Sequence, residues 1–278
     1  MRGTVSRRIV LVCSAVIAGA CAKAEPPAEQ AVAVVPVAPP VVHVEAADYS
    51  FTAPDTVASG PTTFHVMNGG KELHHVVLIK APKADLMKMN PTDPPPAGLV
   101  MLGGPNAALP GGTAEATVDL TPGEYTMVCM ISGPDGKPHM MKGMMRTLTV
   151  TQGSGTAAMP TPDLTVKLTD YAFDMPDTIT AGHHVIRIED AGPQVHEMVF
   201  VKLEPGKTAQ DFLTWAMKMS GPPPGSPVNG VSPMTVGVVN TVAVDLTPGQ
   251  YALVCFVGDA KDKRPHFAHG MIKQITVQ

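Results

Sequence analysis

Two stretches of the chain gather side chains that bind soft metal ions. The first, CMISGPDGKPHMMKGM, runs from Cys129 to Met144, and the second, CFVGDAKDKRPHFAHGM, runs from Cys255 to Met271. Each holds a thiol, an imidazole and a thioether in that order, as C-x9-H-x4-M and then C-x10-H-x4-M. Thiolate and thioether sulfur suit Cu(I), whereas imidazole binds both Cu(I) and Cu(II). The pattern therefore predicts a metal-binding loop that is built twice.

A second imidazole lies well upstream of each loop. His74 precedes Cys129 by 55 residues, and His196 precedes Cys255 by 59 residues. Two imidazoles and one thiolate in a plane, with a weak thioether on the axis, form the ligand set of a type 1 (blue) copper site. We therefore expect one copper ion in each half of the chain. The predicted ligands are His74, Cys129, His139 and Met144 in the first half, and His196, Cys255, His266 and Met271 in the second.

Several neighbouring donors are alternatives to these ligands. His75 competes with His74, although it faces the other side of a strand. His269 competes with His266 but has no counterpart, because Lys142 fills that place in the first half. The other candidates are methionines: Met140, Met141 and Met145 could replace Met144. The pairs Met87 with Met89 and Met217 with Met219 are assigned to packing, with a Cu(I)-handling surface as the alternative.

The donors recur because the chain is a tandem repeat. DYSFTAPDTVASG from Asp48 matches DYAFDMPDTITAG from Asp170 at an offset of 122 residues, which places His74 opposite His196. Farther on, DLTPGEYTMVC matches DLTPGQYALVC at an offset of 126. We assign the first repeat to residues 43–150 and the second to residues 164–278, with a linker at 151–163. The length differences fall in loops, as expected for a duplicated domain.

Each repeat has the pattern of short strands between turns. TFHVMN, HHVVLIK, EATVDL, EYTMVC and RTLTV in the first repeat are rich in β-branched residues and alternate or run apolar. One helix is expected in each repeat, at residues 83–89 and 208–219. Two domains of this kind predict an all-β chain of two Greek-key β-sandwiches in tandem, each with one short helix.

Both repeats resemble the cupredoxins, the plastocyanin and azurin family. LHHVVLIK and VHEMVFVK lie where that family has its first His ligand, and YTMVC…PHMMKGM and YALVC…PHFAHGM lie where it has Cys, His and Met. The resemblance implies a copper-binding fold that transfers electrons to or from a redox partner protein. Two positions depart from the family. His75 and Glu197 replace the Asn that usually follows the first His, and Met130 and Phe256 replace the Ser or Thr that often follows Cys.

Two-domain copper oxidases and reductases pass electrons through His residues that flank the Cys or are paired as His-x-His. Val128 and Val254 precede the cysteines here, and the sequence contains no His-x-His. The sequence therefore predicts that the chain is not an enzyme. It favours an electron carrier with two type 1 sites. The alternatives are copper capture or delivery to a copper-handling partner, and a metal-free cupredoxin-like interaction module.

The N-terminus has the pattern of an export signal. Residues 1–20 combine a basic start with a short apolar segment, and Cys21 follows small residues as in a bacterial lipoprotein signal. We expect Cys21 to be lipidated and residues 21–42, rich in Pro and Ala, to tether the protein. This predicts a protein anchored by lipid to a bacterial membrane, facing the periplasm or the cell exterior. The net charge of −4 argues against nucleic acid as a partner.

Overall fold

Two layers of strands enclose the core of the first repeat in the structure, a computed structural model that describes Gly3, residues 37–89 and residues 98–278. Burial alternates along β1, where Val42, Val44 and Ala46 point inward, as expected for a strand with one face on a core. One layer contains β1 (Val41–Ala47), β2 (Ser50–Thr52), β4 (Gly60–Asn68) and β6 (Thr113–Leu120). The facing layer contains β3 (Thr56–Ala58), β5 (Val77–Ile79), β7 (Gly123–Val128) and β8 (Met145–Thr151).

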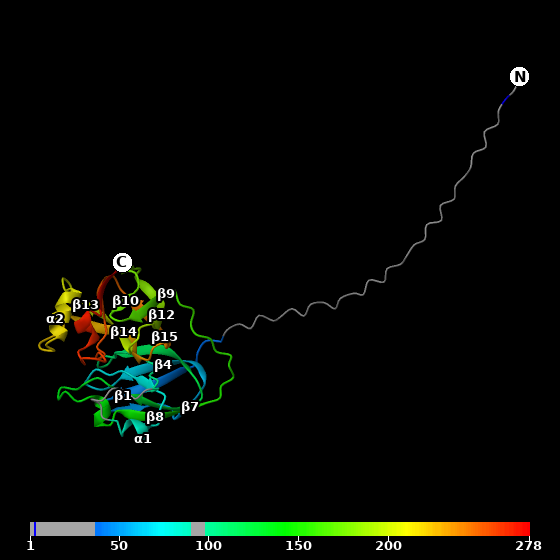
Figure 1. Cartoon of the computed structure of the whole chain (residues 1–278), viewed down its shortest axis with the longest axis horizontal. Coiled ribbons are helices and arrows are strands. Elements are labelled where there is room, and N and C mark those ends of the chain that lie inside the picture. Colours follow the sequence, from blue (N-terminus) through cyan, green and yellow to red (C-terminus); the bar gives the residue numbers. More distant parts are fainter. Residues whose placement is uncertain (1–2, 4–36, 90–97) are drawn as a thin grey trace. The chain divides into compact units, whose positions relative to one another are not determined.

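The second repeat (green to red in Figure 1) also has two layers of strands, but one of them has five strands where the first repeat has four. One contains β9 (Leu164–Thr169), β10 (Ala172–Asp174), β12 (Gly182–Asp190) and β15 (Val239–Leu246). The other contains β11 (Thr178–Ile179), β13 (His196–Leu203), β14 (Gly225–Met234), β16 (Gly249–Val254) and β17 (Ile272–Val277). The predicted all-β class, with two sandwiches that each carry one short helix, is confirmed.

The strand that leads to each cysteine begins at a fixed turn. Tyr125 donates a hydrogen bond from its hydroxyl to the carbonyl of Thr121, at 2.9 Å, and Tyr251 makes the equivalent 2.9 Å bond to Thr247. Both tyrosine rings are fully buried. This arrangement resembles the tyrosine corner of β-sandwiches, which ties a turn to the strand that follows it. The repeated TPG-x-Y sequence therefore fixes where β7 and β16 enter the sandwich.

Both helices are shorter than the sequence predicts. In the first repeat α1 spans only Lys83–Leu86, and no side chain caps its N-terminus. In the second, α2 spans Ala209–Ala216 and begins with a capping box made by Thr208 and Asp211. The structure also contains two 3-10 turns that the sequence did not predict, η1 (His139–Lys142) and η2 (His266–His269).

The two repeats share a sheet. β6 pairs with β15, with Val118 opposite Asn240 and Thr117 opposite Thr241, and this joins eight strands from both repeats into one sheet. Isolated bridges join residues 102 and 105 of the first repeat to Met234 and Val231 of β14. Both repeats belong to the same compact unit of the chain. The domain boundaries drawn from the sequence stay predictions. The signal segment and Cys21 also stay predictions, because Cys21 and all of residues 1–20 except Gly3 lie outside the described residues.

Candidate metal centres

Three predicted ligands of the first repeat meet in its interior. The Nδ1 atoms of His74 and His139 are 3.1 Å apart. Cys129 Sγ lies 3.5 Å from His139 Nδ1 and 4.0 Å from His74 Nδ1. All three side chains are fully buried. Two ring nitrogens and a sulfur at these separations are close enough to hold a single ion.

The second repeat reproduces this cluster. His196 Nδ1 and His266 Nδ1 are 3.1 Å apart, and Cys255 Sγ lies 3.5 Å from His266 Nδ1. These side chains are also fully buried. The backbone N–H of Glu197 donates to Cys255 Sγ at 3.5 Å, which adds a hydrogen bond that favours a thiolate. The same three residue types thus converge in both repeats.

Backbone hydrogen bonds close each ligand loop. Cys129 follows β7, and its carbonyl accepts from the N–H of Met140 at 2.8 Å, which brings η1 against the cysteine. The N–H of Met144 donates to the carbonyl of His139 at 3.0 Å, and Gly143 ends η1 with φ of 103°, a conformation that favours glycine. The loop from Cys255 to Met271 has the equivalent bonds, and Gly270 has the same φ.

Met144 and Met271 are fully buried at the end of these loops. Met144 lies in the same apolar cluster as Cys129, and Met271 lies in the same cluster as Cys255. Their backbones are also tied to the cysteines, because Cys129 N–H donates to the Met144 carbonyl at 3.2 Å and Cys255 N–H to the Met271 carbonyl at 3.3 Å. The structure therefore places both thioether residues beside the cysteines, and their role as axial ligands stays a prediction.

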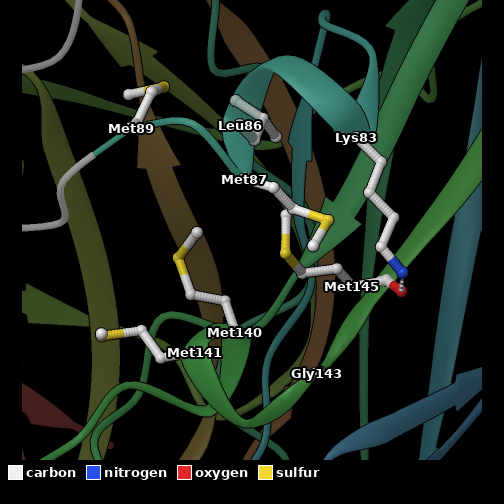
Figure 2. A pocket seen from close by; sticks show the side chains of 8 residues that line it. All are labelled: Lys83, Leu86, Met87, Met89, Met140, Met141, Gly143 and Met145. Atoms are coloured by element: carbon white, nitrogen blue, oxygen red, sulfur yellow. Dashed lines mark hydrogen bonds between the residues drawn. The ribbon is translucent and has the colours of Figure 1, made fainter.

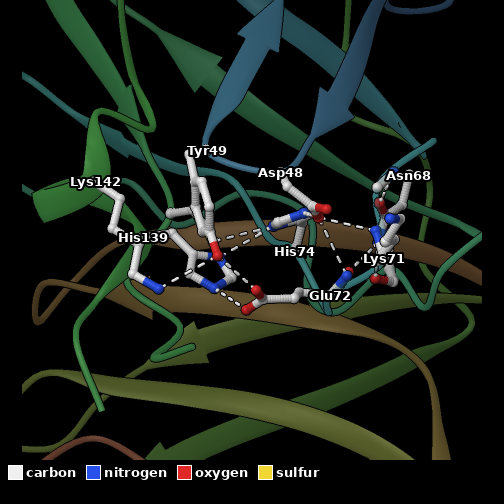
Figure 3. Close-up of polar contacts among 11 residues, drawn as sticks. Asp48, Tyr49, Asn68, Lys71, Glu72, His74, His139 and Lys142 are labelled. Atoms are coloured by element: carbon white, nitrogen blue, oxygen red, sulfur yellow. Dashed lines mark hydrogen bonds and ion pairs between the residues drawn. The ribbon is translucent and has the colours of Figure 1, made fainter. Parts of the chain in front are cut away.

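Carboxylates hold the outward nitrogens of three of the four imidazoles. His74 Nε2 lies 3.2 Å from Asp48 Oδ1, and His196 Nε2 lies 2.8 Å from Asp170 Oδ1. His139 Nε2 lies 2.8 Å from Glu72 Oε2 (Figure 3). Such partners fix the ring orientation and leave Nδ1 free for a metal. In the described part of the chain, the buried Nε2 of His266 has no such partner.

Sequence reasoning missed these carboxylates. Asp48 and Asp170 occupy equivalent positions of the repeated DY dipeptide, so the repeat itself carried a signal that could have found them. Glu72 had no such signal, because Gln194 stands at its place in the second repeat. Glu72 is also held from its other side by Tyr49, whose hydroxyl donates to Oε1 at 2.6 Å. This hydrogen bond is the main reason that the pKa of Glu72 is lowered.

Burial disfavours the charged forms of Cys129, Cys255, His74, His196 and His266. It raises the pKa of the Cys129 thiol to about 11 and raises the pKa of Cys255 as well. It lowers the pKa of His74 and His196, and it lowers the pKa of His266 to about 4. Neutral imidazole is the form that binds a metal. A cation that binds here displaces the thiol proton and compensates the buried thiolate.

The two departures from the cupredoxin pattern still tie the ligand strands together. His75 Nε2 accepts a hydrogen bond from the N–H of Met130 at 2.9 Å. Glu197 Oε1 accepts the equivalent bond from the N–H of Phe256 at 3.0 Å. Each side chain thus reaches from the residue after the first histidine to the residue after the cysteine. His75 is excluded from the three-donor cluster, so its competition with His74 finds no support in the geometry.

The other rival donors also lie outside the clusters. His269 pairs with Asp262 near the surface, with Nε2 and Oδ1 3.1 Å apart. Most of the remaining methionines of the first repeat surround an open hollow of about 310 Å³ (Figure 2). It is lined by Lys83, Leu86, Met87, Met89, Met140, Met141, Gly143 and Met145. Met140 and Met141 belong to η1, so the hollow lies against the turn that carries His139.

The donor set fits copper. Soft thiolate and borderline imidazole suit copper in both of its oxidation states. His74, Cys129 and His139 would hold one ion, and His196, Cys255 and His266 the other. In each repeat, the backbone bonds and carboxylates described above hold the donors in place without an ion.

Comparison with known proteins gives matches to solved structures alone. No protein-family model and no curated protein matches the sequence. Auracyanin A, a "blue" copper protein from Chloroflexus aurantiacus, is 18% identical over 41% of this chain and 99% of its own, with a TM-score of 0.32. A multicopper oxidase is 13% identical over 86% of this chain and 88% of its own, with a TM-score of 0.27. The copper nitrite reductase of Nitrosomonas europaea is 15% identical over 86% of this chain and 93% of its own, with a TM-score of 0.26.

These matches bear on two predictions. The likeness to cupredoxins is confirmed as a cupredoxin-like arrangement of strands. The prediction that the chain is not an enzyme is contradicted, because structures of an oxidase and of reductases align with 86% of it and both repeats hold a His–Cys–His group. The lack of His-x-His and of His beside the cysteines was therefore not sufficient to exclude these classes.

Proposed function

We propose that this chain is a copper protein with one type 1 site in each repeat, and that it transfers electrons to or from a redox partner protein. The observation that carries the proposal is the pair of buried His–Cys–His groups, with ring nitrogens 3.1 Å apart and sulfur 3.5 Å from one of them in each repeat. Copper supplies the redox chemistry by cycling between Cu(I) and Cu(II). The protein holds the donors in one arrangement for both states, which keeps the rearrangement on electron transfer small.

Metal content and colour test this function. Mature protein given Cu(II) should bind two ions per chain and show an intense thiolate-to-copper absorption band. Cys129→Ser should remove one ion and leave the second site filled, and Cys255→Ser should do the reverse. His183→Gln is the control, since its exposed imidazole pairs with Asp245 and lies outside both clusters. A colourless Cu(II) complex would refute the electron carrier, and a protein that binds no copper would leave a metal-free interaction module.

The methionine-lined hollow favours a second candidate function, copper capture or delivery. Five thioethers surround it, and Met87 and Met141 are 69% and 55% exposed. Phe267 and Ile272 stand at the places of Met140 and Met145 in the second repeat and pack there in an apolar cluster. The fold thus does not require sulfur at these positions. Soft sulfur beside the His139 turn suits Cu(I) on its way to or from the first site.

Leucine replacements separate this function from the electron carrier. Met87→Leu with Met141→Leu keeps the apolar volume but removes two sulfurs. If the hollow handles Cu(I), the first site should load more slowly from a Cu(I) chelate, while the thiolate-to-copper band that appears after oxidation of the loaded site to Cu(II) stays the same. Met217→Leu with Met219→Leu is the matched control, because this exposed pair lies in the second repeat. Equal loading rates in both double variants would refute a role for the hollow.

We further propose that the protein is exported and held on a bacterial membrane by a lipid on Cys21, facing the periplasm or the cell exterior. The proposal is supported by the basic and apolar pattern of residues 1–20 and by the Pro- and Ala-rich residues 21–42. No helix within the described residues is both long and apolar enough to cross a membrane. Cys21→Ala should move the protein from the membrane fraction to the soluble fraction after cell lysis. The anchor would be refuted if the Cys21→Ala variant stayed in the membrane fraction and the unaltered mature protein carried no lipid on its N-terminus.

A further inference from the structure

Buried polar side chains form a continuous row between the two candidate metal centres. At one end, the N–H of Met130 donates to Nε2 of His75 at 2.9 Å. At the other end, the N–H of Phe256 donates to Oε1 of Glu197 at 3.0 Å. Met130 and Phe256 directly follow the two cysteines, so each end of the row is one residue from a thiolate.

Asn106 joins the two ends. Its Oδ1 lies 3.3 Å from His75 Nδ1, and its Nδ2 donates to Glu197 Oε2 at 3.0 Å. The exposed fractions of His75, Asn106 and Glu197 are 4%, 2% and 5%, so water does not compete for these bonds. His75 and Asn106 belong to the first repeat and Glu197 to the second. The row therefore crosses the boundary between the repeats.

The hydrogen bonds fix the direction of every donor in the row. Because His75 Nε2 accepts from the backbone, its neutral ring carries the proton on Nδ1 and donates to Asn106 Oδ1. The amide nitrogen of Asn106 then faces Glu197, which accepts from both sides. A buried network in which every member has its partner is rigid, since breaking any one bond leaves a buried group unsatisfied.

Both ends of the row also touch the ligands through the main chain. His75 follows His74, and Glu197 follows His196. In addition, the N–H of Glu197 donates to Cys255 Sγ at 3.5 Å. Each end thus connects to an imidazole ligand and a thiolate ligand of its own repeat. Electronic coupling decays less steeply through covalent and hydrogen bonds than through a gap between apolar side chains.

We propose that Asn106 couples the two copper centres into an electron-exchanging pair. An electron leaves Cu(I) in one repeat, which becomes Cu(II), and reduces Cu(II) in the other repeat to Cu(I). The electron that one centre loses is the electron that the other gains, so the exchange needs no outside reductant and no proton. It rests on the proposed type 1 sites. It gives the two repeats a joint function, in which one centre takes an electron from a partner and the other passes it on.

The test uses the full mature chain loaded with copper at both sites. A pulse of carbon dioxide radical anion, at less than one reducing equivalent per chain, reduces a fraction of the centres. Cys129→Ser and Cys255→Ser provide the separate absorption spectrum of each centre. In the unaltered chain we expect a first-order phase, independent of protein concentration, in which one thiolate band recovers while the other bleaches.

Asn106→Leu should lose this phase while both thiolate bands remain. Asn240→Leu is the matched control, because Asn240 is also fully buried and donates across the same boundary to the carbonyl of Leu102, at 2.8 Å, without touching the row. The control should keep the phase. If Asn106→Leu does not fold, Asn106→Ser takes its place, since serine is too short to reach Glu197.

A phase that persists at its original rate in the Asn106 variant would overturn the proposal. So would its absence from an unaltered chain in which both bands are present. A chain that shows neither band would instead refute the proposed function and the coupling with it, so the two failures are distinguishable.

Discussion

The imidazoles of the two centres differ in what holds their outer nitrogen. Glu72 lies 2.8 Å from His139 Nε2, whereas the described residues offer His266 Nε2 no partner. A nearby negative charge stabilises Cu(II) more than Cu(I), because Cu(II) carries the larger charge. We therefore expect the Glu72 carboxylate to lower the reduction potential of the first centre. The duplication kept the ligands but made the two centres unequal.

Glu72→Gln tests this difference at a single residue. Removing the charge should raise the reduction potential of the first centre and weaken its Cu(II) binding by about 10–100-fold, the usual effect of losing an outer partner of a metal ligand. Redox titration and Cu(II) competition in a Cys255→Ser background measure both quantities for the first centre alone. Glu124→Gln, at an exposed position of β7, should change neither. Identical potentials in the two variants would contradict the assignment.

The residues that sequence reasoning identified are those whose chemistry is repeated. Cys129 and Cys255 were found because both recur before a His and a Met at near-equal spacing. Glu72 and Asn106 were missed for the opposite reason. Glu72 faces Gln194 in the alignment, and Asn106 lies in the excursion where the repeats differ in length. A residue that acts across the boundary between repeats has no reason to be duplicated.

A turn between strands sets the position of each upstream histidine. The turn after β4 passes so close to His74 that a Cβ on Gly70 would lie 2.8 Å from Nε2 and 2.5 Å from Asp48 Oδ1. A Cβ on the equivalent Gly192 would lie 2.6 Å from His196 Nε2. Both separations are shorter than real Cβ contacts, so an added methyl must displace the imidazole or its carboxylate. Glycine is therefore required here for close approach.

Gly70→Ala should weaken copper binding at the first centre alone. Breaking the hydrogen bond between Asp48 and His74 removes an outer partner, for which we expect a loss of about 10–100-fold in affinity. Competition with a chelator in a Cys255→Ser background measures it. The adjacent Gly69→Ala is the control, since the nearest atom to its added Cβ is 3.8 Å away. A first centre that tolerates both substitutions equally would show that the turn does not position His74.

Helix α2 begins with a capping box. The Thr208 hydroxyl accepts from the N–H of Asp211 at 3.1 Å, while the Asp211 carboxylate accepts from the N–H of Thr208 at 2.8 Å. Thr208→Ala should lower the free energy of unfolding by about 1 kcal/mol. Urea denaturation measures this change. Thr214→Ala, inside the same helix, should not destabilise the protein, because alanine is the better helix former. Equal losses in both variants would contradict the capping role.

Strand periodicity predicted the sandwiches better than it predicted the turns. The alternation in β1 and the apolar run in β7 follow from local burial and are visible in the sequence. The η1 turn is not visible in the sequence, because it is fixed by backbone bonds across the ligand loop, such as His139 N–H to the carbonyl of Ile131 at 2.9 Å. The predicted helix at 83–89 ends at Leu86, and no side chain caps its N-terminus at Pro82. Turns that are held by such bonds show no hydrophobic periodicity in the sequence.

The two repeats are joined more closely than their separate patterns suggested. β6 and β15 pair across the boundary, and the Ser232 hydroxyl donates to the carbonyl of Val76 at 2.8 Å from a position 156 residues away in sequence. Leu102 forms a bridge with Met234 of the other repeat. Shared sheets and buried cross-boundary hydrogen bonds are lost together when either repeat opens. We therefore expect the repeats to unfold as one cooperative unit.

The single tryptophan of the chain makes this cooperativity measurable. Trp215 lies in α2 of the second repeat, so its fluorescence reports the unfolding of that repeat. In Cys255→Ser, copper binds the first repeat alone and should stabilise the folded state by about 2.7 kcal/mol at a free concentration of about 100 times Kd. If the repeats unfold together, the thermal midpoint seen by Trp215 rises although no metal is bound near it. The double variant Cys129→Ser with Cys255→Ser should show no rise. Copper in the first repeat could instead leave the thermal midpoint seen by Trp215 unchanged while calorimetry shows a second transition at a higher temperature. That result would mean that the two repeats unfold independently.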